Sequence, residues 1–211
     1  MSTERLKEIV DFSYDRLKSK INGGCIEVGN EASLQLHLAS ILKTVGELYE
    51  VNKNERFSIE LEKPVVQACR FNKSGSDKAE IDIFIAIENI KKKEKYSCAI
   101  EIKFFKKVNH REPNNRYDVF KDIHNLECYD VDFGLLIVVT DHRHYVNQSS
   151  YAPATADFDF RHGKQYKSRT KLIYKTNNPD YPPMTLGGSY KFLWDCVPEG
   201  LQFLKLEVLK D

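Results

Sequence analysis

The chain lacks any long apolar run. Its longest, Phe133 to Val139, has seven residues, whereas a helix that crosses a bilayer needs about twenty. The first residues, Met1 to Leu6, include acidic and basic side chains and are not followed by an apolar stretch, so no secretory signal is expected. We therefore expect a cytoplasmic protein with no membrane partner.

Closely spaced or paired cysteines are also lacking. The cysteines are odd in number and never spaced as Cys-x-x-Cys, which argues against a zinc ribbon and against a disulfide scaffold. We expect them to be reduced and mostly buried, as in a cytosolic protein. They are Cys25, Cys69, Cys98, Cys128 and Cys196.

A strong charge of one sign is lacking too, because the 211 residues carry a net charge of +1. A surface that binds nucleic acid would have to come from local segregation of charge. The chain does have 41% hydrophobic residues, with 11 Tyr and 12 Phe, which is enough for a folded core. We expect one domain over residues 1–211, with a core at about 30–140 and a C-terminal extension at about 141–211.

Helical spacing of apolar residues predicts three helices. The first covers about residues 3–21 and stops at the glycine pair that follows. The second begins after Asn30, a good N-cap, and runs to about residue 49. The third covers about residues 116–128.

Alternation of apolar and polar residues predicts three strands, at about residues 57–61, 81–87 and 98–104. The polar link 88–95 predicts a hairpin loop between the last two. The continuously apolar run 133–139 suits a central strand covered on both faces. Beyond it the pattern loosens, and only residues 190–194 and 202–208 look like further strands. The order predicts an α/β fold with a mixed central sheet flanked by helices and an irregular extension containing short strands.

The hairpin predicts a polar cluster on one face of the sheet. If the turn is centred on Lys91 and Lys92, Asp82 lies opposite Glu101. Period two then places Lys103 on the same face as Glu101, one step along the strand. Glu31, at the start of the second helix, falls near the centre of that helix's apolar stripe and is expected to point toward the sheet.

Three acids held together would raise each other's pKa values, and buried charge of one sign is unfavourable. A divalent cation resolves this conflict, and ligands that are all oxygen suit Mg²⁺. Lys103, beside the metal, could orient or deprotonate a water and stabilise developing negative charge. The cluster therefore suggests metal-assisted hydrolysis of a phosphodiester, a reaction whose barrier must fall by about 20 kcal/mol.

With this order of elements, Asp82 and Glu101-Ile102-Lys103 make residues 30–140 resemble the PD-(D/E)XK nuclease superfamily, the restriction-endonuclease-like fold with an αβββαβ core. The resemblance implies that Asp82, Glu101 and the carbonyl of Ile102 bind metal and that Lys103 positions the water. It also implies that Glu31 is the first-helix acid found in many members. Ile81 replaces the proline of the motif, a departure that many members share. Members cut DNA, occasionally RNA, with Mg²⁺, for which Mn²⁺ can substitute, and usually leave 5′-phosphates.

Several cations are candidates for contacts with phosphates. The stretch 161–171 holds five of them, no acid and an interleaved Tyr166, a pattern that could clamp a nucleic-acid backbone. Others follow Lys103 or the apolar strand at 133–139, where Arg143 stands between two histidines that we expect to belong to an ordinary loop. The candidates are Lys106, Lys107, Arg111, Arg143, Arg161, Lys164, Lys167, Arg169 and Lys171.

Structural interpretations compete with these. Asp82, Glu101 and Lys103 could form a cross-strand ion-pair ladder, Glu31 could be an acid favoured by the helix dipole, and the basic stretches could be solvated loops. The leading hypothesis is a Mg²⁺-dependent DNA endonuclease that acts on double-stranded DNA. A site-specific restriction enzyme is the first guess, because the extension could supply recognition loops, and a repair or mobile-element nuclease is the next. A palindromic site would favour a homodimer by symmetry. The alternatives are a non-catalytic nucleic-acid-binding protein that kept the fold, and an RNA nuclease.

Overall fold

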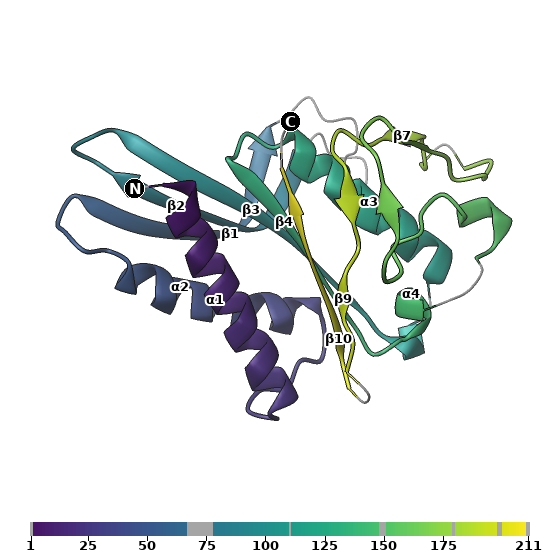
Figure 1. Ribbon diagram of the computed structural model, residues 1–211, viewed down its shortest axis with the longest axis horizontal. Helices are drawn as coiled ribbons and strands as arrows, with labels where there is room; N and C mark the ends of the chain where they lie inside the picture. The colour runs from purple at the N-terminus through teal and green to yellow at the C-terminus, as the bar shows by residue number, and fades with distance from the viewer. Residues whose placement is uncertain are drawn as a thin grey trace. The chain divides into compact units, whose positions relative to one another are not determined.

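The computed structural model describes residues 2–66, 78–109, 111–147, 151–178, 180–197 and 200–209, and shows an α/β protein (Figure 1). Its long helices are α1 (Thr3–Asn22), α2 (Glu31–Leu48) and α3 (Glu112–Cys128). Its long strands are β1 (Glu55–Val66), β2 (Lys78–Asn89), β3 (Glu94–Phe105), β4 (Phe133–Thr140) and β10 (Gln202–Val208).

The central sheet has six strands in the order β1-β2-β3-β4-β10-β9, where β9 is Trp194–Asp195. The predicted α/β class, with a mixed central sheet and flanking helices, is confirmed. The extension contributes the last two strands of this sheet. Strand β10 coincides with the strand predicted at residues 202–208, whereas β9 overlaps the strand predicted at residues 190–194 only at Trp194.

The rest of the extension forms very short elements. Strand β5 (Gln165–Tyr166) pairs with β8 (Tyr190–Lys191), and β6 (Lys171–Leu172) pairs with β7 (Met184–Thr185). Strands of two residues carry no period that a sequence pattern can detect, so β5, β6 and β7 were not predicted. The short helices are η1 (Lys107–Asn109), α4 (His144–Asn147) and η2 (Pro153–Thr155).

Local capping hydrogen bonds and a proline explain where α2 and α3 begin. The Asn30 side chain accepts from the Ser33 backbone N–H, and the Ser33 hydroxyl accepts from that of Asn30, which makes a capping box for α2. Helix α3 begins at Glu112, one turn before the predicted start. Pro113 is compatible with this earlier start because the first turn of a helix needs no backbone N–H from that position.

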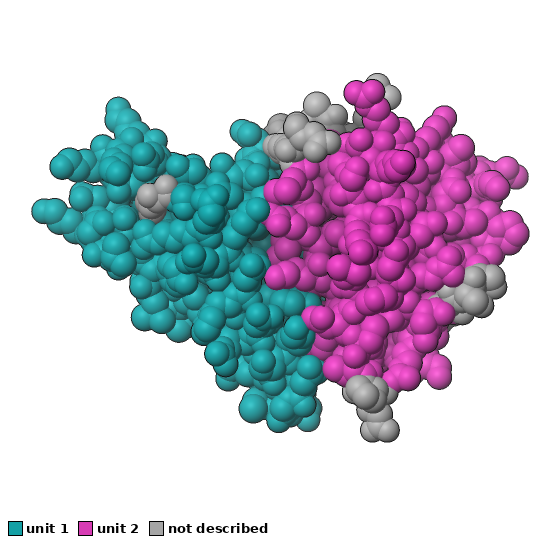
Figure 2. Space-filling model, viewed as in Figure 1, with its two compact units in different colours: residues 1–102, 129–134 teal, residues 103–128, 135–211 magenta. Residues whose placement is uncertain are grey.

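The chain forms two compact units (Figure 2). The first contains residues 1–102 and 129–134, and the second contains residues 103–128 and 135–211. The division does not fall at residue 140, where the sequence analysis separated a core from an extension. It passes through β3, between Ile102 and Lys103.

In the first unit, β2 and β3 are antiparallel and pair from Asn89↔Glu94 to Ile83↔Ile100. The turn is centred on Lys91 and Lys92, as predicted. Antiparallel β1 covers the other edge of β2, and Phe57 pairs with Ile87.

Helices α1 and α2 of the first unit pack against each other (Figure 1). A Cβ placed on Gly46 of α2 would lie 2.4 Å from ring atoms of Phe57. Because Phe57 and Ile87 are register partners, helix α2 covers the aliphatic face of the sheet. Side chains alternate along a strand, so Asp82 and Phe84 belong to the opposite face.

Within the described residues, no helix is long and apolar enough to cross a membrane. Of the four described cysteines, Cys98 is buried, Cys128 is half-buried, and Cys25 and Cys196 are exposed. The expectation of mostly buried cysteines is therefore wrong for these four. Cys25, for instance, lies in the turn after α1 rather than inside an element. Cys69 lies outside the described residues.

Candidate active site

Asp82 lies in β2, one residue beyond the Ile83↔Ile100 pair of the β2–β3 ladder. Its side chain is buried, and Oδ2 accepts a hydrogen bond from the backbone N–H of Ile102 at 2.7 Å. Its main-chain carbonyl accepts from Nε2 of Gln35, on α2, at 2.6 Å. Both the carboxylate and the peptide of Asp82 are therefore fixed by donors from neighbouring elements.

The residue opposite Asp82 on β1 has an unusual backbone. The pairs Leu61↔Ile83 and Lys63↔Ile81 place Glu62 opposite Asp82, and Glu62 has a φ of 49°. A left-handed conformation is uncommon for a residue other than glycine. Such strained residues cluster at functional sites, where the surrounding structure holds them in place.

Gln35 connects this strained residue to Asp82. Its Nε2 donates to Oε1 of Glu62 at 2.7 Å as well as to the Asp82 carbonyl. A side chain of α2 thus stands beside the distorted stretch of the β1–β2 ladder and holds both strands.

Glu101 is also buried, with 1% of its surface exposed. The register that pairs Ile83 with Ile100 places Glu101 opposite Asp82, as predicted. Its Oε1 accepts a hydrogen bond from the hydroxyl of Tyr129 at 2.9 Å. Two carboxylates are therefore positioned on one buried face of the sheet, each by a donor that orients it.

Lys103 follows two residues later in β3 and opens the second unit. Its Nζ lies 2.7 Å from Oδ2 of Asp122 on α3, and both side chains are buried. Asp118 lies one turn before Asp122. Burial and the charge of Asp122 raise the pKa of the Asp118 carboxyl, and the charge of Lys103 opposes this shift. Helix α3 therefore supplies the acids that surround Lys103.

The fourth predicted residue, Glu31, is the first residue of α2 and is half-buried. Gln35, one turn further along this helix, makes the described contact with the main chain of Asp82. In the part of the chain that the structure describes, no three His, Cys, Asp or Glu side chains are gathered as a group that could hold a metal ion. Glu31, Asp82 and Glu101 were expected to surround one cation, and they are not found gathered in this way.

The oxygen atoms of Asp82, Glu101 and Ile102 suit a hard cation as ligands. Asp82 and Glu101 offer carboxylate oxygens, and Ile102, which follows Glu101 in the chain, offers a main-chain carbonyl. The hydrogen bonds from Ile102 N–H and the Tyr129 hydroxyl orient the two carboxylates. Oxygen donors with such outer partners fit Mg²⁺.

Three residues that position the site were not predicted from the sequence: Gln35, Tyr129 and Asp122. Asp122 had the clearest signal, because it falls among the inward positions of a helix that also buries Asn115 and Asn125. Buried polar side chains on a helix need partners. Gln35 and Tyr129 had no comparable signal, since neither belongs to a charged pattern.

The cations proposed to bind phosphate belong to the second unit and differ in their surroundings. Lys107 and Arg111 are exposed just after β3. Lys106 is half-buried, and its Nζ lies 5.8 Å from the centre of the Phe104 ring. Arg143 is exposed and donates to the carbonyl of Val197 at 3.2 Å.

The basic stretch 161–171 contains no acidic residue, but an acidic side chain from outside the stretch lies beside two of its cations. Buried Asp159 lies 2.9 Å from a guanidinium nitrogen of Arg161 and 3.7 Å from Nζ of Lys164. These two cations therefore have an acidic partner, which weakens their assignment to phosphate binding. The other three cations of the stretch are exposed: Lys167, Arg169 and Lys171.

The two histidines beside Arg143 belong to a packed cluster. The rings of His142 and His144 stack with centroids 5.2 Å apart, and Nε2 of His144 lies 3.2 Å from Oε1 of Glu112. The same carboxylate oxygen pairs with buried Arg116. His142 precedes α4 and His144 is the first residue of that helix, so the expectation of an ordinary loop is wrong for His144.

The chain has no match among protein-family models, curated proteins or solved structures. The resemblance to the PD-(D/E)XK superfamily therefore rests on the residues and the element order of this chain.

Proposed function

We propose that the protein is a Mg²⁺-dependent nuclease that hydrolyses phosphodiester bonds of DNA, with residues 30–140 forming an αβββαβ core of the PD-(D/E)XK type. One observation carries this proposal: Asp82 and Glu101 are held on one buried face of the β2–β3 pair, and Lys103 follows Glu101 on β3. The observed order α2-β1-β2-β3-α3-β4 supports it.

Each residue has a distinct role in this proposal. Asp82, Glu101 and the carbonyl of Ile102 would hold the cation, which when bound polarises the phosphoryl oxygen and lowers the pKa of the attacking water. Lys103 orients the water and stabilises charge on the phosphate in the transition state. The N–H of Ile102 and the hydroxyl of Tyr129 hold the two carboxylates in position, and Asp122 holds the Lys103 ammonium.

Burial favours this interpretation over a structural ion-pair ladder. Ladders of charged residues on a sheet usually face solvent, where each pair contributes about 0.2–1 kcal/mol. Asp82 and Glu101 are 5% and 1% exposed, so both carboxylates lie on a covered face and not in a solvent-exposed ladder.

The test is a nicking assay on supercoiled plasmid, with genomic DNA and RNA as parallel substrates. The wild type should cut in Mg²⁺ and not in EDTA, and Asp82→Asn, Glu101→Gln and Lys103→Ala should each cut at least about 100-fold more slowly. Glu94→Gln is the matched control, because it changes the charge of β3 by the same amount seven residues before Glu101. It should cut at the wild-type rate.

The results separate the candidate functions. A Lys103→Ala protein that cuts as fast as the wild type would overturn the role of this lysine. Metal-independent binding without cutting of any substrate would favour the non-catalytic nucleic-acid-binding protein, and cutting of RNA alone would favour the RNA nuclease.

We also propose that the extension contributes to DNA contacts, because it carries exposed Lys167, Arg169 and Lys171. Lys171 belongs to β6, and the other two lie between β5 and β6. A restriction enzyme would give discrete fragments from genomic DNA, whereas a repair or mobile-element nuclease would depend on DNA structure. A homodimer would appear in analytical ultracentrifugation in the presence of DNA.

A further inference from the structure

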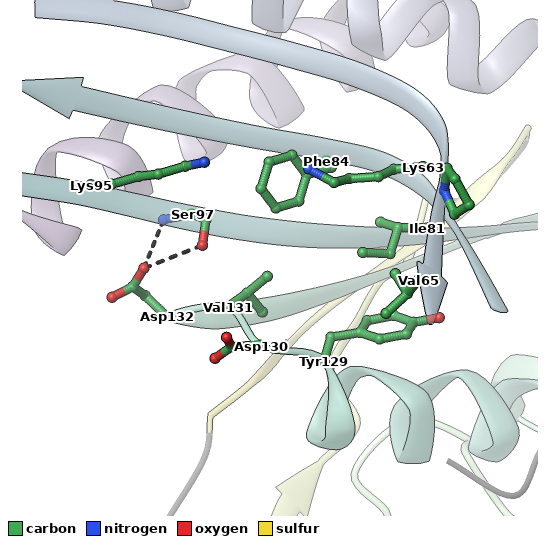
Figure 3. A pocket seen from close by; sticks show the side chains of 11 residues that line it. Lys63, Val65, Ile81, Phe84, Lys95, Ser97, Tyr129, Asp130, Val131 and Asp132 are labelled. Carbon is green, nitrogen blue, oxygen red and sulfur yellow. Dashed lines mark hydrogen bonds between the residues drawn. The ribbon is translucent and has the colours of Figure 1, made fainter. Parts of the chain in front are cut away.

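A pocket of about 570 Å³ lies in the first unit, close to the buried acids (Figure 3). Tyr129 lines it, and the hydroxyl of the same residue donates to Glu101. The pocket also has basic, acidic and apolar walls. Its lining comprises Lys63, Pro64, Val65, Ile81, Phe84, Lys95, Ser97, Tyr129, Asp130, Val131 and Asp132.

The basic wall is arranged around an aromatic ring. Phe84 lies two residues beyond Asp82 on the same face of β2. Nζ of Lys63 is 3.4 Å from the centroid of the Phe84 ring, and Nζ of Lys95 is 5.8 Å from it. Lys63 also lies 3.2 Å from Oε2 of Glu60, whose side chain is 53% exposed, so a phosphate would replace this solvent-exposed partner. Both lysine side chains are directed toward this ring in Figure 3. Two cations thus stand over one aromatic side chain, at distances typical of cation–π contacts.

The acidic wall lies just after Tyr129. Oδ2 of Asp132 accepts from the backbone N–H of Ser97 at 2.7 Å, which fixes this carboxylate on β3. Asp130 is exposed at the rim, beside Tyr129 in Figure 3. Val131, between the two aspartates, and Ile81 add apolar surface.

These walls match the parts of a nucleotide. A volume of about 570 Å³ falls within the 300–1,000 Å³ typical of small-ligand sites. Cations bind phosphate, aromatic and aliphatic side chains contact the faces of a base, and a carboxylate accepts from the exocyclic amino group of a base. An inorganic anion would use only the basic wall, and an apolar ligand would use neither charged wall.

We propose that this pocket binds one unpaired nucleotide of a nucleic-acid strand, adjacent to the candidate active site. Lys63 and Lys95 contact its phosphate, Phe84 and Tyr129 contact its base, and Asp130 accepts from the base amino group. This inference rests on the proposed function and specifies its substrate as a strand with at least one unpaired base. Bases that carry an amino group, such as cytosine, bind better than thymine.

The test measures binding by fluorescence anisotropy in EDTA at a pH of about 7.5, so that no cutting intervenes. The probes are short labelled strands of dC or of dT and a fully paired duplex of the same length. The wild type should bind the single strands more tightly than the duplex, and dC more tightly than dT. Lys63→Ala/Lys95→Ala should lose about tenfold in affinity for single strands.

Lys91→Ala/Lys92→Ala is the matched control, because it removes two exposed lysines from the β2–β3 turn, outside the pocket. It should lose less than about threefold. Asp130→Ala, a change at an exposed residue that should not disturb folding, should bring the affinities for dC and dT to within about twofold of each other.

Two results would overturn the pocket assignment. Equal losses in both double variants would show that surface charge alone governs binding, and equal wild-type affinity for single strands and duplex would exclude a site for an unpaired nucleotide. Pocket-dependent binding in a protein that never cuts would remove the nuclease proposal alone. Metal-dependent cutting that is unchanged in Lys63→Ala/Lys95→Ala would remove the pocket proposal alone.

Discussion

Lys103 and Asp122 form a buried ion pair, with Nζ and Oδ2 2.7 Å apart and side-chain exposures of 11% and 4%. Removing one partner of such a pair leaves a buried charge, which typically costs about 3–5 kcal/mol. Asp122→Ala should therefore lower the free energy of unfolding, measured with urea, by about 3 kcal/mol. Lys103→Met/Asp122→Ala should recover most of that loss, because it removes both charges.

The control for this ion-pair prediction is the exposed pair of Lys43 and Glu47 on α2, with N and O 2.6 Å apart. Lys43→Ala should change the free energy of unfolding by less than about 0.5 kcal/mol. Equal effects of Asp122→Ala and Lys43→Ala would contradict the prediction.

The left-handed backbone of Glu62 predicts a difference between two small substitutions. Both Glu62→Gly and Glu62→Ala remove the carboxylate that accepts from Gln35, but only glycine adopts a φ of 49° without strain. Glu62→Gly should be more stable than Glu62→Ala by about 1 kcal/mol in chemical denaturation. Equal stability of the two proteins would show that the backbone at this position is not strained.

The close contact between α2 and β1 predicts that alanine at Gly46 is destabilising as well. A Cβ there would lie 2.4 Å from ring atoms of Phe57, whereas a Cβ at Gly29 meets nothing within 4 Å. Overpacking of this kind costs about 1–3 kcal/mol. Gly46→Ala should lower the melting temperature by several degrees, and Gly29→Ala should not lower it. A melting temperature unchanged in Gly46→Ala would show that the Phe57 ring moves aside freely.

His124 on α3, in the second unit, predicts that the stability of the protein depends on pH. Hydrogen bonds to Cys128 and then to Glu127 raise the pKa of the imidazole from 6.5 to about 9. The nearest atoms are Sγ of Cys128, 3.9 Å from Nε2, and Oε2 of Glu127, 3.7 Å from Nδ1. NMR titration should therefore show a pKa of about 9 for His124 in the wild type. The pKa should be lower in Cys128→Ala and in Glu127→Gln.

The same shift fixes the sign of the effect on stability. Because the pKa of His124 is higher in the folded chain, its stabilisation is complete below a pH of about 6.5 and is lost as the pH rises through about 9. His124→Gln should lower the melting temperature at a pH of about 6 and have a smaller effect at about 9.5. An effect of the same size at both pH values would exclude a charged His124 as its cause.

The hairpin of β2 and β3 shows what local sequence could predict. Two lysines in a polar link located the turn, and period two then placed Asp82 opposite Glu101, because register follows from the turn and the side-chain period alone. The sequence of β2 also indicates a strand covered on both faces, because one side is aliphatic and the other carries Phe84 and Ala86.

The residues that position these acids could not be predicted, because their contacts depend on tertiary packing. Gln35 and Tyr129 lie 47 and 28 residues away in the sequence from the acids they contact. No local pattern in the sequence indicates contacts over such separations. The pairing of Asp159 with Arg161 and Lys164 could have been predicted, because the aspartate stands two residues before the basic stretch. It was not predicted because only the charges inside the stretch 161–171 were counted.

The discontinuity of the first unit limits how this protein can be divided. Residues 129–134 return to that unit after α3 and carry Tyr129, the donor to Glu101, as well as Asp130, Val131 and Asp132 of the pocket. A fragment that stops at residue 102 would keep Asp82 and Glu101 but would lack this wall. To express the first unit alone, one would have to link residue 102 directly to residue 129, so that the excised helix is replaced by a short artificial turn.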